Sequence, residues 1–168
     1  MKKLFLILVS IAAIAACKST PDADSQYAAD MIPKGEAIPA FALNDRDGNL
    51  RSGEEFKGRY VVYDFWATWC PDCRADVPAM KELYAKYADK AVFVGISFDT
   101  EPEKLDAYVA ENGIEWLQLS DFVSKKESTV ADSFRVKWIP SMYLVDPEGN
   151  VLLGTVMVDK LSAALEAL

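Results

Sequence analysis

The chain has 168 residues, 51% of them apolar, a net charge of −8 and no histidine. This length suits one domain, and the composition is too apolar for a disordered chain and too polar for a polytopic membrane protein. The acidic balance argues against nucleic acid as a partner, because phosphate binding needs clustered lysine and arginine. Without histidine there is no Ser-His-Asp triad, Cys-His dyad or His-ligated metal, so we expect neither metal nor cofactor.

The first seventeen residues have the pattern of a signal peptide. Lys2 and Lys3 precede an apolar run of eleven residues, 4–14, which is too short to span a bilayer comfortably. Residues 14–17 (IAAC) resemble the lipobox of bacterial lipoproteins, which predicts lipidation of Cys17. The alternative is an ordinary secretory signal with an incidental cysteine.

Lipidation would place the protein in the cell envelope, anchored to a membrane and facing the periplasm. Residues 18–35 are polar with scattered alanine and proline, so we expect a flexible tether there. The expected division is therefore signal peptide at 1–17, tether at 18–35 and one domain at 36–168. No aspartate follows Cys17, which by the enterobacterial sorting rule favours the outer membrane.

The remaining sequence alternates strand and helix patterns, without internal repeats. Strands are indicated by continuous apolar runs or by pairs of runs across turn sequences such as NDRDG and DPEGN. Helices are indicated by apolar residues three and four apart. The expected strands are residues 38–43, 49–51, 60–66, 91–98, 116–119, 141–145 and 151–156. The expected helices are residues 71–87, 102–112, 130–134 and 161–168.

The chemistry is expected at Cys70 and Cys73, which follow a strand directly and begin a helix. Helix-initial N–H groups and the macrodipole stabilise an anion, which lowers the pKa of the first cysteine. Pro71 suits the first helical turn, where its missing N–H costs nothing. We therefore expect Cys70 exposed at the helix tip and Cys73 about one turn inside. A zinc site would lack ligands, and a structural disulfide closing so small a loop would stabilise little.

Residues 62–73 (VYDFWATWCPDC) resemble the active-site segment of thioredoxins. The match extends to Pro78, where the family has a helix-kinking proline, and to Ile139-Pro140, where it has a cis-proline facing the cysteines. With the signal, the hairpin and an insert near 113–135, the chain resembles membrane-tethered TlpA/ResA-type thiol-disulfide oxidoreductases. The resemblance implies an α/β thioredoxin fold: a central mixed β-sheet flanked by helices, with an N-terminal β-hairpin and a short insert before the cis-Pro strand.

The resemblance also implies an activity and its partners. The Cys70 thiolate attacks a protein disulfide, and Cys73 then resolves the mixed disulfide. The partners are disulfide-containing protein substrates and a membrane electron donor that reduces the enzyme again. The resemblance suggests apocytochrome c thiols or oxidised envelope proteins as substrates.

Three carboxylates are candidates for tuning this chemistry. Asp64 lies inside an apolar strand, so we expect a raised pKa and a role in accepting the Cys73 proton; a capping or ion-paired aspartate is the alternative. Thioredoxins pair this aspartate with a lysine, which Gly95 replaces here. Asp76 stands where ResA-type reductases carry glutamate, and is either a second acid/base or a solvated helix carboxylate. Asp72 is negative beside the thiolate and favours a reductant.

We expect substrates to bind around the two cysteines and the proline loop, the segment that contains Ile139 and Pro140. Because Pro140 has no N–H, neighbouring backbone groups are free to pair with a substrate strand. We expect the Trp69 indole to be exposed beside Cys70, and Trp66 to lie in the core. The candidate substrate-binding residues are Trp69, Pro71, Asp72, Ile139 and Pro140.

Two other activities use the same fold. A thiol peroxidase of the peroxiredoxin type would carry a threonine three residues before its cysteine and a proline further upstream, whereas Thr68 is two residues before Cys70. A disulfide-introducing oxidase would use the same two cysteines with a more oxidising potential.

Overall fold

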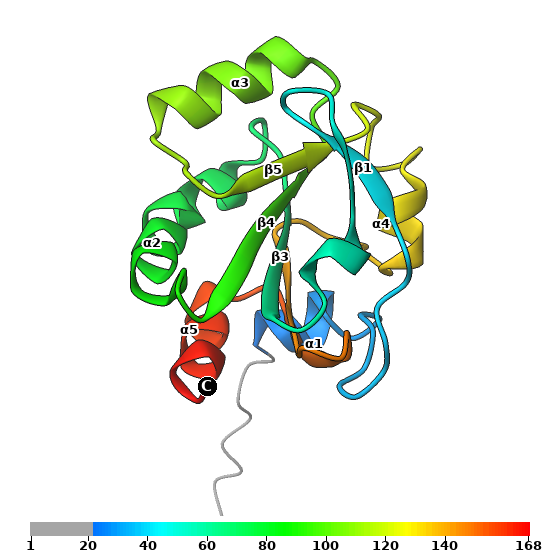
Figure 1. Ribbon diagram of the computed structural model, residues 1–168, viewed down its shortest axis with the longest axis vertical. Helices are drawn as coiled ribbons and strands as arrows, with labels where there is room; N and C mark the ends of the chain where they lie inside the picture. The colour runs from blue at the N-terminus through cyan, green and yellow to red at the C-terminus, as the bar shows by residue number, and fades with distance from the viewer. Residues whose placement is uncertain (1–21) are drawn as a thin grey trace, which may run out of the picture.

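The structure is a computed structural model that describes residues 22–168, and its centre is a seven-stranded mixed sheet with the strand order β2-β1-β5-β4-β3-β6-β7 (Figure 1). The strands are β1 (Ala42–Asp45), β2 (Leu50–Ser52), β3 (Tyr60–Trp66), β4 (Ala91–Ser97), β5 (Leu117–Ser120), β6 (Ser141–Val145) and β7 (Val151–Thr155). The helices are α1 (Ala23–Tyr27), η1 (Gly53–Phe56), α2 (Pro71–Tyr87), α3 (Pro102–Glu111), α4 (Thr129–Ser133) and α5 (Val158–Glu166). The expected α/β thioredoxin fold is confirmed.

Strand β3 lies at the centre of the sheet and ends at the cysteine loop. It pairs in parallel with β4 and antiparallel with β6, and residues 61–66 are all buried. Tyr63 and Phe65 pack with Phe134 and other aromatic side chains on one face. Asp64 and Trp66 alternate with them and face the other side, where Trp66 contacts Tyr108 of α3. Figure 1 shows α2 and α5 on one side of the sheet and α4 on the other.

The N-terminal hairpin is shorter and later than expected. Strand β1 starts at Ala42, which pairs with Ser52, and ends at Asp45, two residues into the expected turn. The reason is local: the Asp45 carboxylate accepts hydrogen bonds from the backbone N–H groups of Asp47 (3.0 Å) and Asn49 (2.8 Å) and closes a tighter turn. The strand expected over residues 38–43 is therefore wrong over residues 38–41.

The segment before the hairpin differs from the expected tether. Met31 and Ile32 are buried, and the Ile32 N–H donates to the Tyr143 hydroxyl at 3.0 Å. Residues 35–38 then exchange backbone hydrogen bonds with residues 149–151, beside the start of β7. Residues 22–38 thus cover an edge that would otherwise expose unpaired backbone groups. The sequence missed this because polar composition does not reveal backbone pairing. The expected signal peptide, Cys17 and residues 18–21 lie outside the described residues.

Within residues 22–168, no helix combines the length and apolar character needed to cross a membrane.

Candidate active site

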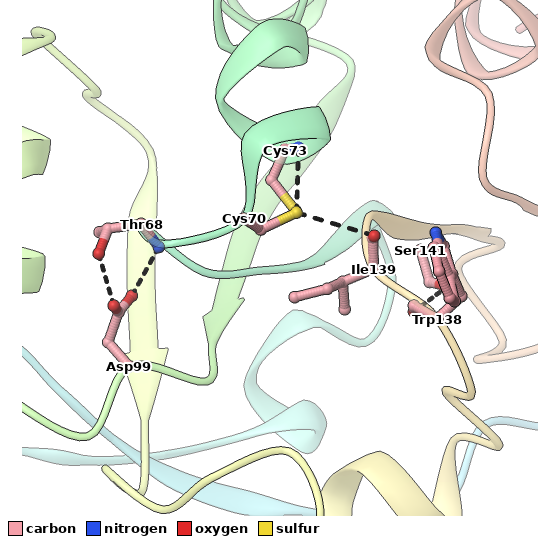
Figure 2. The surroundings of a disulfide bond; sticks show 7 residues. All are labelled: Thr68, Cys70, Cys73, Asp99, Trp138, Ile139 and Ser141. Atoms are coloured by element: carbon pink, nitrogen blue, oxygen red, sulfur yellow. Dashed lines mark hydrogen bonds between the residues drawn. A yellow bond between two sulfur atoms is a disulfide. The ribbon is translucent and has the colours of Figure 1, made fainter.

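The two cysteines meet at the start of α2, as their spacing predicts. Cys70 is the N-cap residue of α2 and Pro71 occupies its first turn. A disulfide joins Cys70 to Cys73, with the Cα atoms 5.3 Å apart, and the Cys73 N–H donates to Cys70 Sγ at 3.2 Å (Figure 2). This N–H is one of the helix-initial donors that have no partner within the helix, so it is available to stabilise a thiolate.

Cys70 is not exposed, contrary to the expectation from its position at the helix tip. Both cysteines are 4% exposed. Cys70 Sγ lies 3.7 Å from the Ile139 carbonyl oxygen, so the loop before β6 covers it from one side. The sequence shows which residue begins a helix, but not which distant loop lies against it.

The loop over Cys70 contains a cis peptide bond between Ile139 and Pro140, as the resemblance implies. A hydrogen bond within the loop restrains its backbone, because the Ser141 hydroxyl donates to the Trp138 carbonyl oxygen at 2.8 Å. The Trp138 indole is 44% exposed and stacks on Tyr27 of α1 with ring centroids 4.6 Å apart.

The other predicted substrate-binding residues lie on the helix side of the disulfide. Trp69 is 57% exposed, as expected, whereas Trp66 is buried in the core. Pro71 and Asp72 are exposed in the first turn of α2. The exposed Trp69, Pro71 and Asp72 are therefore neighbours of the cysteines in the chain, and the Ile139 carbonyl oxygen lies against Cys70.

Two of the predicted carboxylates, Asp64 on β3 and Asp76 on α2, have raised pKa values. Asp64 is 8% exposed, and burial raises its pKa to about 7, with a further contribution from the negative charge of Asp76. Asp76 is half-buried; burial raises its pKa first, followed by the charges of Asp72 and Asp159. The expected rise for Asp64 is confirmed, and the negative charge of Asp76 contributes to it.

Gly95 lies beside Asp64 in the sheet, and a side chain from the next strand fills the space above it. A Cβ on Gly95 would lie 2.7 Å from Nε2 and 2.8 Å from Cδ of Gln118. The Gln118 amide oxygen accepts a hydrogen bond from Trp66 Nε1 at 3.0 Å. A neutral amide therefore occupies the region where thioredoxins carry a cation, which agrees with the raised pKa of Asp64.

Two functional candidates escaped the sequence reasoning, Gln118 and Asp99. Asp99 is 2% exposed, and its carboxylate accepts hydrogen bonds from Thr68, two residues before Cys70. The available signal was its position directly after a buried strand, where the carboxyl ends of parallel strands gather functional groups. Among residues 22–168, no cluster of three or more cysteine and carboxylate side chains is arranged to hold a metal ion.

Comparisons with known proteins agree with this geometry. A family model described as the AhpC/TSA family matches residues 34–153. The chain belongs to this family. Thioredoxin-like protein YneN of Bacillus subtilis is 31% identical over 138 residues, which cover 80% of this chain and 80% of the relative. Thiol-disulfide oxidoreductase ResA of Oceanobacillus iheyensis is 28% identical over 170 residues, 96% of this chain and 84% of the relative.

A solved structure extends the similarity to three dimensions. The thioredoxin domain of a thiol-disulfide oxidoreductase from Bacteroides vulgatus matches with a TM-score of 0.73 and 30% identity, covering 81% of this chain and 97% of that one. Together with the Cys70–Cys73 pair, these relatives identify a ResA/TlpA-like thiol-disulfide oxidoreductase with a thioredoxin fold.

Proposed function

We propose that the protein is a lipid-anchored, extracytoplasmic reductase of protein disulfides. The observation that carries the proposal is the Cys70–Cys73 disulfide at the N-terminus of α2, 3.7 Å from the Ile139 carbonyl oxygen. This arrangement provides a thiol pair, a helix terminus that stabilises a thiolate and a neighbouring loop for a substrate strand.

The reaction begins from the reduced enzyme. The Cys70 thiolate attacks one sulfur of a substrate disulfide, which forms a mixed disulfide and releases the other substrate sulfur as a thiolate that takes up a proton. Cys73 then loses its proton and attacks Cys70 Sγ, which forms the Cys70–Cys73 disulfide and releases the second substrate thiol. Two electrons pass to the substrate. A dithiol donor in the membrane returns the enzyme to its reduced form.

Asp64 serves as the base for the second step. With a pKa of about 7 it is partly ionised near neutral pH, so it can accept the Cys73 proton and release it again. Asp76 acts as the second acid/base, because its charge already affects Asp64 and it lies nearer the helix surface.

The substrate lies across the disulfide between the helix tip and the proline loop. Trp69 supplies an apolar contact, Pro71 and Asp72 line the helix side, and the backbone beside Ile139 and Pro140 pairs with the substrate chain. The substrates are oxidised envelope proteins or apocytochrome c, a class suggested by the ResA-type resemblance.

The location rests on the N-terminal sequence, which lies outside the described residues. The IAAC sequence at residues 14–17 supports lipidation of Cys17 and a periplasm-facing site, with the outer membrane favoured over the inner membrane. The described domain would then be held at the membrane by the residues between Cys17 and Asp22.

The activity is tested by insulin reduction with the full chain produced in a Gram-negative host. We expect Cys70→Ser to abolish turnover, and Cys73→Ser to accumulate a mixed disulfide that is visible on a non-reducing gel. Cys17→Ser should keep the activity but leave the membrane fraction. Retained turnover in Cys70→Ser would refute the catalytic proposal, and a membrane-bound Cys17→Ser variant would refute the anchor.

A further inference from the structure

Asp99 is a buried carboxylate that the reaction described above does not use. It lies two residues after the end of β4 and is 2% exposed. In this region the Phe98 N–H donates to the Trp66 carbonyl oxygen at 3.0 Å, so the chain at Asp99 runs beside the loop that follows β3. That loop, residues 67–69, connects β3 to the active-site helix.

The Asp99 carboxylate accepts three hydrogen bonds, and two of them come from one residue. Thr68 donates its backbone N–H at 3.0 Å and its hydroxyl at 2.6 Å, one to each carboxylate oxygen. The Ser97 hydroxyl donates the third at 2.7 Å. Asp99 therefore binds Thr68 through both its backbone N–H and its side-chain hydroxyl.

Such a carboxylate is costly to bury, because desolvation penalises its charge. Asp99 takes part in none of the ion pairs found within residues 22–168, so its direct stabilising contacts are hydrogen bonds from neutral donors. A longer-range attraction to Lys104, whose pKa the Asp99 charge helps to raise, adds to them. Hydrogen bonds to an ionised acceptor are short and strong, which suits the fixing of one backbone position.

Thr68, which Asp99 binds, lies in the same turn as Cys70. The Cys70 N–H donates to the Ala67 carbonyl oxygen at 3.1 Å, so residues 67–70 form one turn with Thr68 inside it. Figure 2 shows Asp99 and Thr68 on one side of Cys70 and Ile139 on the other.

We propose that Asp99 is a positioning residue that holds Cys70 at the N-cap of α2 through Thr68, so that the Cys73 N–H can stabilise the Cys70 thiolate after the disulfide is reduced. In the oxidised protein the disulfide itself restrains Cys70. In the reduced protein that bond is gone, and the Asp99–Thr68 hydrogen bonds keep Cys70 Sγ near the Cys73 N–H, 3.2 Å away in this structure. The role rests on Cys70 being the attacking thiol in the proposed function.

The test compares variants of the full chain in the reduced state. Thr68→Val removes the 2.6 Å hydroxyl bond and keeps the branched shape, whereas Thr68→Ser keeps the hydroxyl and is the matched control. Asp99→Asn removes the charge and retains a similar shape. The readouts are the pH dependence of Cys70 alkylation by iodoacetamide and the rate of insulin reduction; thermal unfolding shows whether each variant is folded.

We expect the pKa of the Cys70 thiol to rise in Thr68→Val and Asp99→Asn, with insulin reduction slower by about tenfold, as a misplaced reacting group predicts. Thr68→Ser should behave like the unaltered protein. A purely structural role would lower the unfolding temperature and leave the Cys70 alkylation profile in place.

Two results would overturn the proposal. One is an unchanged alkylation profile and rate in folded Thr68→Val. The other is a lower Cys70 pKa in Asp99→Asn with Thr68→Val unchanged, because removal of a nearby negative charge alone would give that pattern. Failure of the proposed function is recognised separately, since Cys70→Ser would then still reduce insulin in an otherwise unaltered chain.

Discussion

Asp64 lies on β3 between Met142 of β6 and Gly95 of β4, with 8% of its surface exposed. Its pKa rises from 3.8 in the unfolded chain to about 7 in the folded protein. Between these values the folded protein holds a proton that the unfolded chain has lost. The free energy of unfolding therefore falls as the pH rises through this window and stays lower above it. At the pH where Asp64 must act as a base, its ionised carboxylate therefore lowers the free energy of unfolding.

Replacing Asp64 by Asn should separate these two effects. We expect Asp64→Asn to be more stable than the unaltered protein at about pH 8, by about 2–4 kcal/mol, and nearly equal to it at about pH 3. Insulin reduction at about pH 8 should fall by about tenfold or more, because no base remains to accept the Cys73 proton. Urea unfolding at the two pH values measures the first effect and a turbidity assay the second.

The exposed Asp89 provides the control for this substitution, since Asp89→Asn changes the net charge equally. Equal stability of Asp64→Asn and the unaltered protein at the higher pH would contradict the raised pKa. Undiminished turnover would remove Asp64 from the mechanism.

For single residues, the sequence predicts those features of the site that depend on neighbouring residues in the chain. The spacing of Cys70 and Cys73 and the carboxylate inside an apolar strand were visible in the chain itself. The hydrogen bonds of Asp99 and Gln118 were not, because Thr68 and Trp66, their respective partners, lie 31 and 52 residues away in the sequence. Nor was the burial of Cys70, which depends on a loop 69 residues further on.

Among the elements, the N-terminal segment departs most from expectation. Asp24 of α1 accepts hydrogen bonds from the Val156 N–H and the Thr155 hydroxyl, both at 2.8 Å, and pairs with Lys160 at 2.7 Å. Since α1 has only five residues, these contacts and not intrinsic helix stability hold it in place. Its Tyr27 ring stacks on Trp138, so the segment also supports the loop that carries Pro140.

Loss of the Asp24 contacts should release this segment. We expect Asp24→Ala to lower the free energy of unfolding by about 1–2 kcal/mol, because it leaves the Val156 N–H without its partner. Hydrogen exchange at the Val156 and Ile32 amides should become faster. Asp30→Ala, at an exposed position of the same segment, is the matched control.

Two results would contradict this role of the Asp24 contacts. If the Ile32 amide of the unaltered protein exchanged at the rate of an unfolded chain, residues 22–35 would be the flexible tether that their composition suggests. An effect of Asp30→Ala equal to that of Asp24→Ala would assign the loss to the segment's net charge.

For the whole molecule, the apolar patterns predict every strand and every helix except α1 and η1, and the resemblance of residues 62–73 to thioredoxins implies the topology. The buried runs of β3 and β4 and the helical period of α2 are strong local signals, and most of their bounds agree with the structure within two residues. The edge contacts of residues 22–38 follow no such period. They depend on backbone pairing with the β6–β7 turn, which only the folded molecule shows.

The direction of electron flow belongs to the molecule as a whole, because the reduction potential combines the thiolate site, the buried carboxylates and the acidic surface. The exposed Asp72 beside the disulfide and the net charge of −8 both disfavour an additional negative charge on Cys70. Both therefore favour a reducing protein.

The most direct measurement is the equilibrium of the Cys70–Cys73 disulfide with glutathione, followed by tryptophan fluorescence or alkylation, which gives its reduction potential. A reductase should have a value near that of thioredoxin, about −270 mV. A value near about −120 mV, typical of a strong oxidant, would mean that the protein introduces disulfides and would contradict the proposed direction.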